Sequence, residues 1–209
     1  MRKILIVVML SLVGCATDVN ISISDKVADV MNNSVVRVAL FNEYGGYYGY
    51  GTGWALDDET IITAGHALDG ASTVALVSRR VRITTNKFSL DFAGEIGKPD
   101  IGLVHLDGNY GFKPLKISNK PIKLLDKLYV VGCGLGSPLH VSTVIVSGQA
   151  NEIGYIVTDG NTGPGDSGSP VLNADGEVVG VLLICWERGA IGGILPIVTY
   201  MEWLKTLRR

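Results

Sequence analysis

Short runs of β-branched and other apolar residues recur along most of this chain, with turn residues between them. From Ser34 onward the runs return roughly every eight to twelve residues, which is the spacing of strands in barrels and sandwiches. Glycine supplies 27 of the 209 residues, which suits a chain that turns often. The pattern predicts an all-β protein with a sizeable core.

The runs fall into two halves, joined by a loop over 109–121 that holds two prolines. In the first half they cover 34–42, 52–66, 72–78, 81–86, 88–96 and 100–107. In the second half they cover 127–134, 140–151, 153–160, 167–173, 176–186 and 192–198. We therefore expect one β unit over 34–112 and another over 113–209. Tyr200, Trp203, Leu204 and Leu207 have helical spacing and predict a short C-terminal helix.

The N-terminal segment has the pattern of an export signal. Arg2 and Lys3 precede an uncharged, mostly apolar run over 4–14. This run is too short to span a bilayer, which takes about 20 residues. We expect residues 1–14 to be removed and residues 15–33 to form a polar tether, with a short helix near 25–31 at its end.

The charge balance excludes one class of partner. Lys and Arg together number 18 against 20 Asp and Glu, which gives a formal net charge of −2. Loss of residues 1–14 would remove two cations and make it −4. Nucleic acid is therefore not an expected partner, because no basic excess is present to neutralise phosphates.

Three segments carry groups suited to nucleophilic catalysis: Thr63-Ala64-Gly65-His66, Asp100-Ile101-Gly102-Leu103-Val104 and Gly165-Asp166-Ser167-Gly168-Ser169-Pro170. A serine hydroxyl needs a neighbouring base to take its proton, and an imidazole suits that role. A buried carboxylate can then hold the imidazole in one tautomer. Ser167, His66 and Asp100 are the candidates for nucleophile, base and carboxylate.

Each candidate also has a structural interpretation. The Gly-Asp-Ser-Gly sequence is rich in turn formers, and a histidine at a strand end is often only a packed side chain. Asp91 and Asp107 are alternatives to Asp100, although only Asp100 precedes an apolar run in this way. His105 and His140 lie outside any motif, and we interpret both as structural.

Together, the three segments in this order resemble the trypsin/chymotrypsin-like serine peptidases. The chain is most similar to their bacterial HtrA branch, which also carries motifs like Gly51-Thr52-Gly53 and the run over 173–180. The resemblance covers roughly residues 34–205 and implies a chymotrypsin-like fold of two antiparallel six-stranded barrels, with the site in the cleft between them. It implies a serine endopeptidase, a hydrolase acting on protein or peptide substrates.

The same resemblance assigns further roles. The backbone N–H groups of Gly165 and Ser167 would form the oxyanion hole. The substrate pocket would be lined by Asn161, Thr162, Leu183, Ile184, Cys185, Gly192 and Gly193. None of these carries charge, so we expect cleavage after apolar or small residues.

The chain also departs from the HtrA pattern. That branch usually has Asn where this chain has Asp166 and Gly where it has Ser169. A PDZ domain after the peptidase domain is not expected. The tyrosine-rich and glycine-rich hairpin over 44–51 is either a substrate-facing loop or a flexible connection.

Leu12-Val13-Gly14-Cys15 resembles the lipobox of bacterial lipoproteins. It implies that Cys15 is lipidated and that the chain is attached by lipid to a membrane of a bacterial envelope. In a Gram-negative host this would be the outer membrane or the periplasmic face. The alternative is an ordinary signal peptide with an incidental cysteine.

The remaining cysteines, Cys133 and Cys185, either form a disulfide after export or are buried thiols. No Cys/His cluster has zinc spacing, so neither a metal nor another cofactor is expected. The competing function is a catalytically silent binding lipoprotein that keeps the trypsin fold. A third hypothesis is a peptidase with very narrow substrate specificity.

Overall fold

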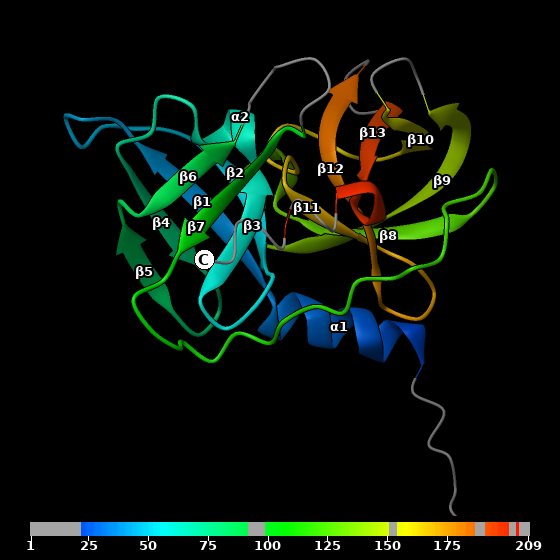
Figure 1. Ribbon diagram of the computed structural model, residues 1–209, viewed down its shortest axis with the longest axis horizontal. Helices are drawn as coiled ribbons and strands as arrows, with labels where there is room; N and C mark the ends of the chain where they lie inside the picture. Colours follow the sequence, from blue (N-terminus) through cyan, green and yellow to red (C-terminus); the bar gives the residue numbers. More distant parts are fainter. Residues whose placement is uncertain (1–21, 92–98, 151–153, 187–190, 201–203, 205–209) are drawn as a thin grey trace, which may run out of the picture.

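The computed structural model describes residues 22–91, 99–150, 154–186, 191–200 and 204. Its strands form two β units that lie side by side, with helix α1 below them (Figure 1). Each unit is built from short antiparallel strands joined by turns. The all-β prediction of two barrel-like units is therefore confirmed.

The first unit is a seven-stranded sheet in the order β5-β4-β1-β2-β3-β7-β6. Its elements are β1 Val35–Phe41, β2 Tyr47–Ala55, β3 Thr60–Ala64, α2 Gly65–Leu68, β4 Thr73–Val77, β5 Arg82–Thr85, β6 Phe88–Asp91 and β7 Ile101–His105. Along β1, Val36, Val38 and Leu40 are buried in one cluster, which is the period of a strand with one face on a core. The sheet has seven strands where the family resemblance implied six, because the run over 52–66 contributes to both β2 and β3. The short strands β5 and β6 lie at opposite ends of the sheet.

The second unit is a closed barrel of six strands in the order β10-β13-β12-β11-β8-β9. Its elements are β8 Lys127–Gly132, the 3-10 turn η1 Gly134–Gly136, β9 His140–Ala150, β10 Ile156–Gly160, β11 Ser169–Leu172, β12 Val178–Trp186 and β13 Ile191–Pro196. Val130, Val144 and Val171 come from three different strands and meet in its core. Closure leaves this sheet without a free edge.

A shared apolar cluster joins the two units. It contains Trp54 from β2, Leu172 from β11 and Val181 from β12, together with Val27 and Val30 of α1. Helix α1 (Ile23–Asn33) begins at Ser22, whose hydroxyl accepts a hydrogen bond from the N–H of Asp25. The second half of the expected tether is therefore a packed helix that contacts β1, β8 and β9.

The last element of the described chain is the 3-10 turn η3 (Ile197–Tyr200). The expected C-terminal helix also depends on Trp203 and Leu207, which lie outside the described residues, whereas Leu204 is buried. The signal segment and Cys15 lie outside them as well. Within the described ranges, no helix is both long enough and apolar enough to cross a membrane.

Candidate active site

His66 and Asp100 lie side by side in the first unit. His66 is in the short helix α2 directly after β3, and Asp100 directly precedes β7, the strand that pairs with β3. The Nδ1 atom of His66 is 2.5 Å from Oδ2 of Asp100. The backbone N–H of His66 donates to the other carboxylate oxygen at 2.7 Å. One carboxylate therefore fixes both the ring and the backbone of this histidine.

The residue before His66 has to be glycine. A Cβ atom on Gly65 would lie 2.8 Å from Oδ1 of Asp100, closer than real contacts allow. Tyr155 also lies near the carboxylate. Burial raises the pKa of Tyr155, and the nearby charge of Asp100 raises it further. No motif around Tyr155 predicts this position, because it depends on how the two units pack together.

Ser167 lies in the tight turn that precedes β11. The N–H of Asp166 donates to the carbonyl of Gly163 at 3.0 Å, and the N–H of Ser169 donates to the carbonyl of Asp166 at 2.9 Å. Gly165 and Gly168 have φ angles of +101° and +89°, which glycine adopts without strain. These two glycines let the backbone reverse on either side of Ser167.

This turn is docked on the first unit beside α2. The N–H of Thr52 donates to the carbonyl of Ser167 at 2.9 Å. A Cβ atom on Gly168 would lie 2.1 Å from the carbonyl oxygen of Thr52 and 2.7 Å from the backbone nitrogen of Ala64. The Ser167 turn therefore meets the end of β3, next to His66.

The hydroxyl of Ser167 points back into its own unit, the second one. It donates a hydrogen bond of 3.2 Å to the carbonyl of Leu183 in β12. Both Ser167 and His66 are described, and no hydrogen bond joins them. The structure thus brings His66 and Asp100 into direct contact and places Ser167 nearby with its hydroxyl on a different acceptor.

Asp166 is a buried carboxylate next to Ser167. Its two oxygens accept hydrogen bonds from the N–H groups of Gly134, at 2.7 Å, and Gly163, at 2.9 Å. Burial raises the pKa of Asp166, while these N–H groups and His140 act in the opposite direction. Nε2 of His140 lies 4.0 Å from the carboxylate. His140 therefore approaches the turn, a proximity that its place in the sequence does not indicate.

The candidate oxyanion donor Gly165 packs against Tyr50 of β2. A Cβ atom on Gly165 would lie 2.1 Å from a ring carbon of Tyr50. The guanidinium of Arg37 stacks on the same ring, 4.4 Å from its centroid. Tyr50 belongs to the hairpin over 44–51, whose sequence is compatible with a substrate-facing loop or a flexible connection. Its ring supports the turn in front of Ser167.

Most of the predicted pocket residues come together. Cys185 and Ile184 of β12 pair with Gly192 and Gly193 of β13, and the Cys185 thiol lies 3.6 Å from the carbonyl of Gly163. A Cβ atom on Gly192 would lie 3.5 Å from the buried hydroxyl of Thr162, which interacts with the Cys185 thiol.

Two predicted pocket residues lie differently. Asn161 is exposed. The side chain of Leu183 is buried in the shared cluster between the units, so only its backbone faces Ser167.

Cys133 and Cys185 are free thiols, and burial raises the pKa of each. The Cys133 thiol donates to the carbonyl of Gly51 at 3.2 Å, at the junction of the units. His105 lies 3.3 Å from the hydroxyl of Ser89, away from these segments. Among the described residues, no group of His, Cys, Asp or Glu could hold a metal ion.

The family model described as a trypsin-like peptidase domain matches residues 51–181 of this chain. The chain belongs to this family. The match includes the segments that carry His66, Asp100 and Ser167. A trypsin-like peptidase domain with this order of segments agrees with the geometry described above.

Bacterial relatives carry similar domains. The chain is 28% identical over 167 residues to the serine protease HhoA of Synechocystis sp., covering 71% of this chain and 40% of HhoA. It is 27% identical over 140 residues to a DegP-like periplasmic serine endoprotease of Pseudomonas savastanoi. That match covers 63% of this chain and 28% of the relative. The chain thus spans well under half the length of these relatives.

Solved structures share the fold at lower identity. The serine endoprotease from Yersinia pestis superposes with a TM-score of 0.73 at 20% identity, over 91% of this chain and 68% of that one. The active form of the Rv3671c protease from M. tuberculosis superposes with a TM-score of 0.72 at 18% identity, over 88% of this chain and 84% of that one.

Proposed function

We propose that this trypsin-like domain is a serine endopeptidase in which Ser167, His66 and Asp100 act together. The observation that carries the proposal is the double contact between Asp100 and His66 beside a docked serine turn. Asp100 occupies Nδ1 of the ring, which leaves Nε2 to act as the base. A carboxylate that also holds the backbone of His66 fixes the direction of that nitrogen.

The reaction begins with a rotation of one side chain. The hydroxyl of Ser167 leaves the carbonyl of Leu183 and turns to Nε2 of His66. Its oxygen then attacks the peptide carbonyl carbon while its proton passes to Nε2. The negative charge that forms on the substrate oxygen is stabilised by the N–H groups of Gly165 and Ser167.

The tetrahedral intermediate collapses when the C–N bond breaks and His66 gives its proton to the leaving amine. Water then enters, loses a proton to His66 and releases the acid from Ser167, and that proton returns to the serine oxygen. All of these steps use groups of this chain and water.

The substrate is a protein or peptide with an apolar or small residue before the cleaved bond. The predicted pocket positions carry no charge, and Asp159 on β10 is exposed. Export to a bacterial envelope is supported by the N-terminal pattern and by relatives named periplasmic proteases.

Lipid attachment at Cys15 completes the proposed localisation, because several acyl chains anchor stably where a single one does not. Fatty-acid labelling of the wild type and Cys15→Ser tests it. Label in the wild type alone is expected, and absence of label in both would contradict it.

The test of the activity is labelling by a fluorophosphonate, which reacts with activated serines. The wild type should be labelled, and Ser167→Ala should not. An unlabelled, inactive wild type would favour the binding lipoprotein, in which Ser167 keeps its bond to Leu183.

A further inference from the structure

A cavity of about 290 Å³ lies at the junction of the two units, and Arg37 is one of the residues that line it. Residues from α1, β1, the end of β4 and the segment before β9 line it: Met31, Asn32, Arg37, Val77, Ser78, Arg79, Ser137, Pro138 and Leu139. Its volume is at the lower end of the range for small-molecule sites, roughly 300 Å³ upward.

Two cations and four apolar side chains shape this cavity, and no acidic residue lines it. Arg37 is half-buried in β1, and its Nε atom is buried with no hydrogen-bond partner. One terminal nitrogen donates to the hydroxyl of Tyr47 at 2.9 Å. Among the described residues, no carboxylate lies within ion-pair distance of Arg37. A cation withdrawn from water without a counter-charge is unfavourable, and an anion would relieve that cost.

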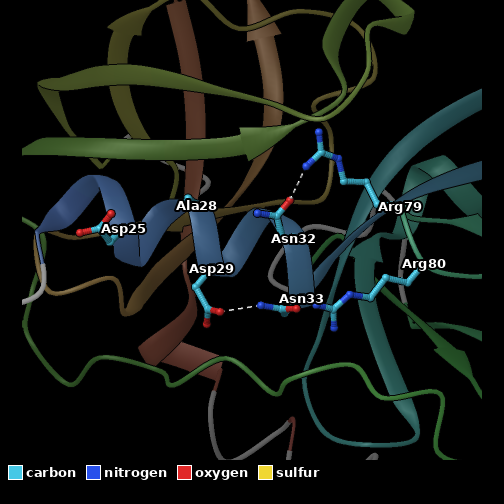
Figure 2. A pocket seen from close by; sticks show the side chains of 7 residues that line it. All are labelled: Asp25, Ala28, Asp29, Asn32, Asn33, Arg79 and Arg80. Atoms are coloured by element: carbon cyan, nitrogen blue, oxygen red, sulfur yellow. Dashed lines mark hydrogen bonds between the residues drawn. The ribbon is translucent and has the colours of Figure 1, made fainter.

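The neighbouring cavity shows the contrast. It shares Asn32 and Arg79 with the first cavity and also contains Arg80 (Figure 2). There, however, Asp25 and Asp29 also line the space, and Asp29 forms an ion pair with Lys113 at 3.0 Å. Figure 2 shows Arg79 reaching across to Asn32, with a hydrogen bond of 3.1 Å. Acidic side chains therefore line the neighbouring cavity, whereas none lines the Arg37 cavity.

We propose that the Arg37 cavity is a second ligand site, which takes a small carboxylate with an apolar tail. The carboxylate pairs with Arg37, whose planar guanidinium suits carboxylate geometry. The tail lies against the apolar wall of Met31, Val77, Pro138 and Leu139. The volume fits a free acid of this kind rather than a folded partner.

Occupation of this site reaches the proposed catalytic turn through one side chain. Arg37 stacks on one face of the Tyr50 ring, and that ring packs against Gly165. A ligand that holds Arg37 on the ring therefore also holds Tyr50 against the turn. This coupling rests on the proposed function, whereas binding to the cavity does not.

Hexanoate is a suitable probe, with hexanamide as its uncharged match. At roughly tenfold above its Kd, hexanoate should raise the melting temperature by about 3–6 °C. Hexanamide should have no such effect. Arg37→Met keeps the aliphatic stem and should abolish the hexanoate shift. Arg80→Met, in the neighbouring cavity only, should retain it. An equal shift with hexanamide, or an undiminished shift in Arg37→Met, would overturn the site.

The coupling has its own readout. Bound hexanoate should raise kcat for a peptide substrate at least about twofold in the wild type. In Arg37→Met, kcat should be the same with and without hexanoate. Binding with an unaltered kcat would overturn the coupling. Since the melting experiment needs no catalysis, a wild type that proves inactive leaves the binding test intact.

Discussion

The N–H of Thr52 donates a 2.9 Å hydrogen bond to the carbonyl oxygen of Ser167, and this bond ties the second unit to the first. Thr52 is held in turn, because its carbonyl accepts from the hydroxyl of Thr63 at 2.7 Å, three residues before His66. The serine and the histidine therefore share a short, rigid connection. Small changes at this junction should affect activity more than stability.

Gly168→Ala tests this junction. The added Cβ would lie 2.1 Å from the carbonyl of Thr52, so the turn has to move away from β2. A non-glycine residue at this positive φ also costs about 1–3 kcal/mol. We expect a loss of stability of that size and a fall in peptide hydrolysis of more than about 100-fold, since misplaced reacting groups are that costly.

Gly176→Ala is the matched control. Gly176 has a similar φ of +78°, but a Cβ there would contact only the flexible side chain of Lys26. It lacks the backbone clash, so it should lose less stability than Gly168→Ala in thermal unfolding and keep its activity. If both variants lost activity equally, the junction would not position Ser167.

Much of the fold could be predicted because strands with one buried face repeat every second residue. Val36, Val38 and Leu40 show this period in the sequence and are buried together in the structure. The start of α1 was harder to predict. Ile23 and Val27 are spaced for a helix, but the surrounding polar residues resemble a tether, and burial against both units decides the outcome.

The site was predictable only where one segment carried its own signal. His66, Asp100 and Ser167 each lie in a short motif. The approach of His140 to Asp166, the ring of Tyr50 on Gly165 and the vicinity of Tyr155 to Asp100 have no local signature. These contacts join residues far apart in sequence, so they follow from packing of the units and not from any single segment.

Alanine at Ser167 or at His66 should each remove most of the peptidase activity, and the double variant should lose little more. Once the nucleophile is absent, its base has nothing to activate. Asp100→Asn should lower turnover on the order of 10⁴-fold, as the equivalent change does in a serine protease with this triad, because the ring loses its tautomer.

His105→Ala is the control, since His105 contacts Ser89 and lies away from the site. The measurement is turnover of a peptide substrate together with a melting curve for each variant. Multiplying losses in the double variant, or an active Ser167→Ala, would contradict a shared mechanism.

Asp166 should give the protein a distinctive pH dependence. Burial raises the pKa of Asp166 above its ordinary value of 3.8, so folding favours the protonated acid. Its contribution to stability is therefore largest below pH 3.8 and is lost as the pH rises through the folded pKa. Asp166→Asn should flatten this decline in the free energy of unfolding.

Asp175→Asn should change the pH dependence of stability in the opposite direction. Lys120 bonds to Asp175 and lowers the pKa of its carboxyl. Its contribution is present above the unfolded pKa and lost as the pH falls through the folded one. Chemical denaturation across the acid range should show the two variants changing the slope in opposite directions. The same direction in both would contradict the assigned effect of burial on Asp166.

Cleavage specificity follows from the uncharged pocket positions. Cys185 and Gly192 face each other across β12 and β13, with the buried hydroxyl of Thr162 beside Gly192. None of these three residues carries a charge that could pair with a lysine or arginine of the substrate, and burying such a cation unpaired is unfavourable. A peptide library should therefore be cut after small or apolar residues.

Gly192→Ser narrows the same position and sharpens the test. Its added Cβ would lie 2.8 Å from the hydroxyl of Thr158 and 3.2 Å from a methyl group of Leu182, so the space beside Thr162 shrinks. Cleavage after larger apolar residues should fall by about 10-fold or more relative to cleavage after alanine, because one methylene-sized change in a pocket is worth that much. Gly148→Ser on β9 meets only Val157 and serves as the control, with an unaltered profile. A library cut mainly after Lys or Arg, or a profile that Gly192→Ser leaves unchanged, would place the specificity pocket elsewhere.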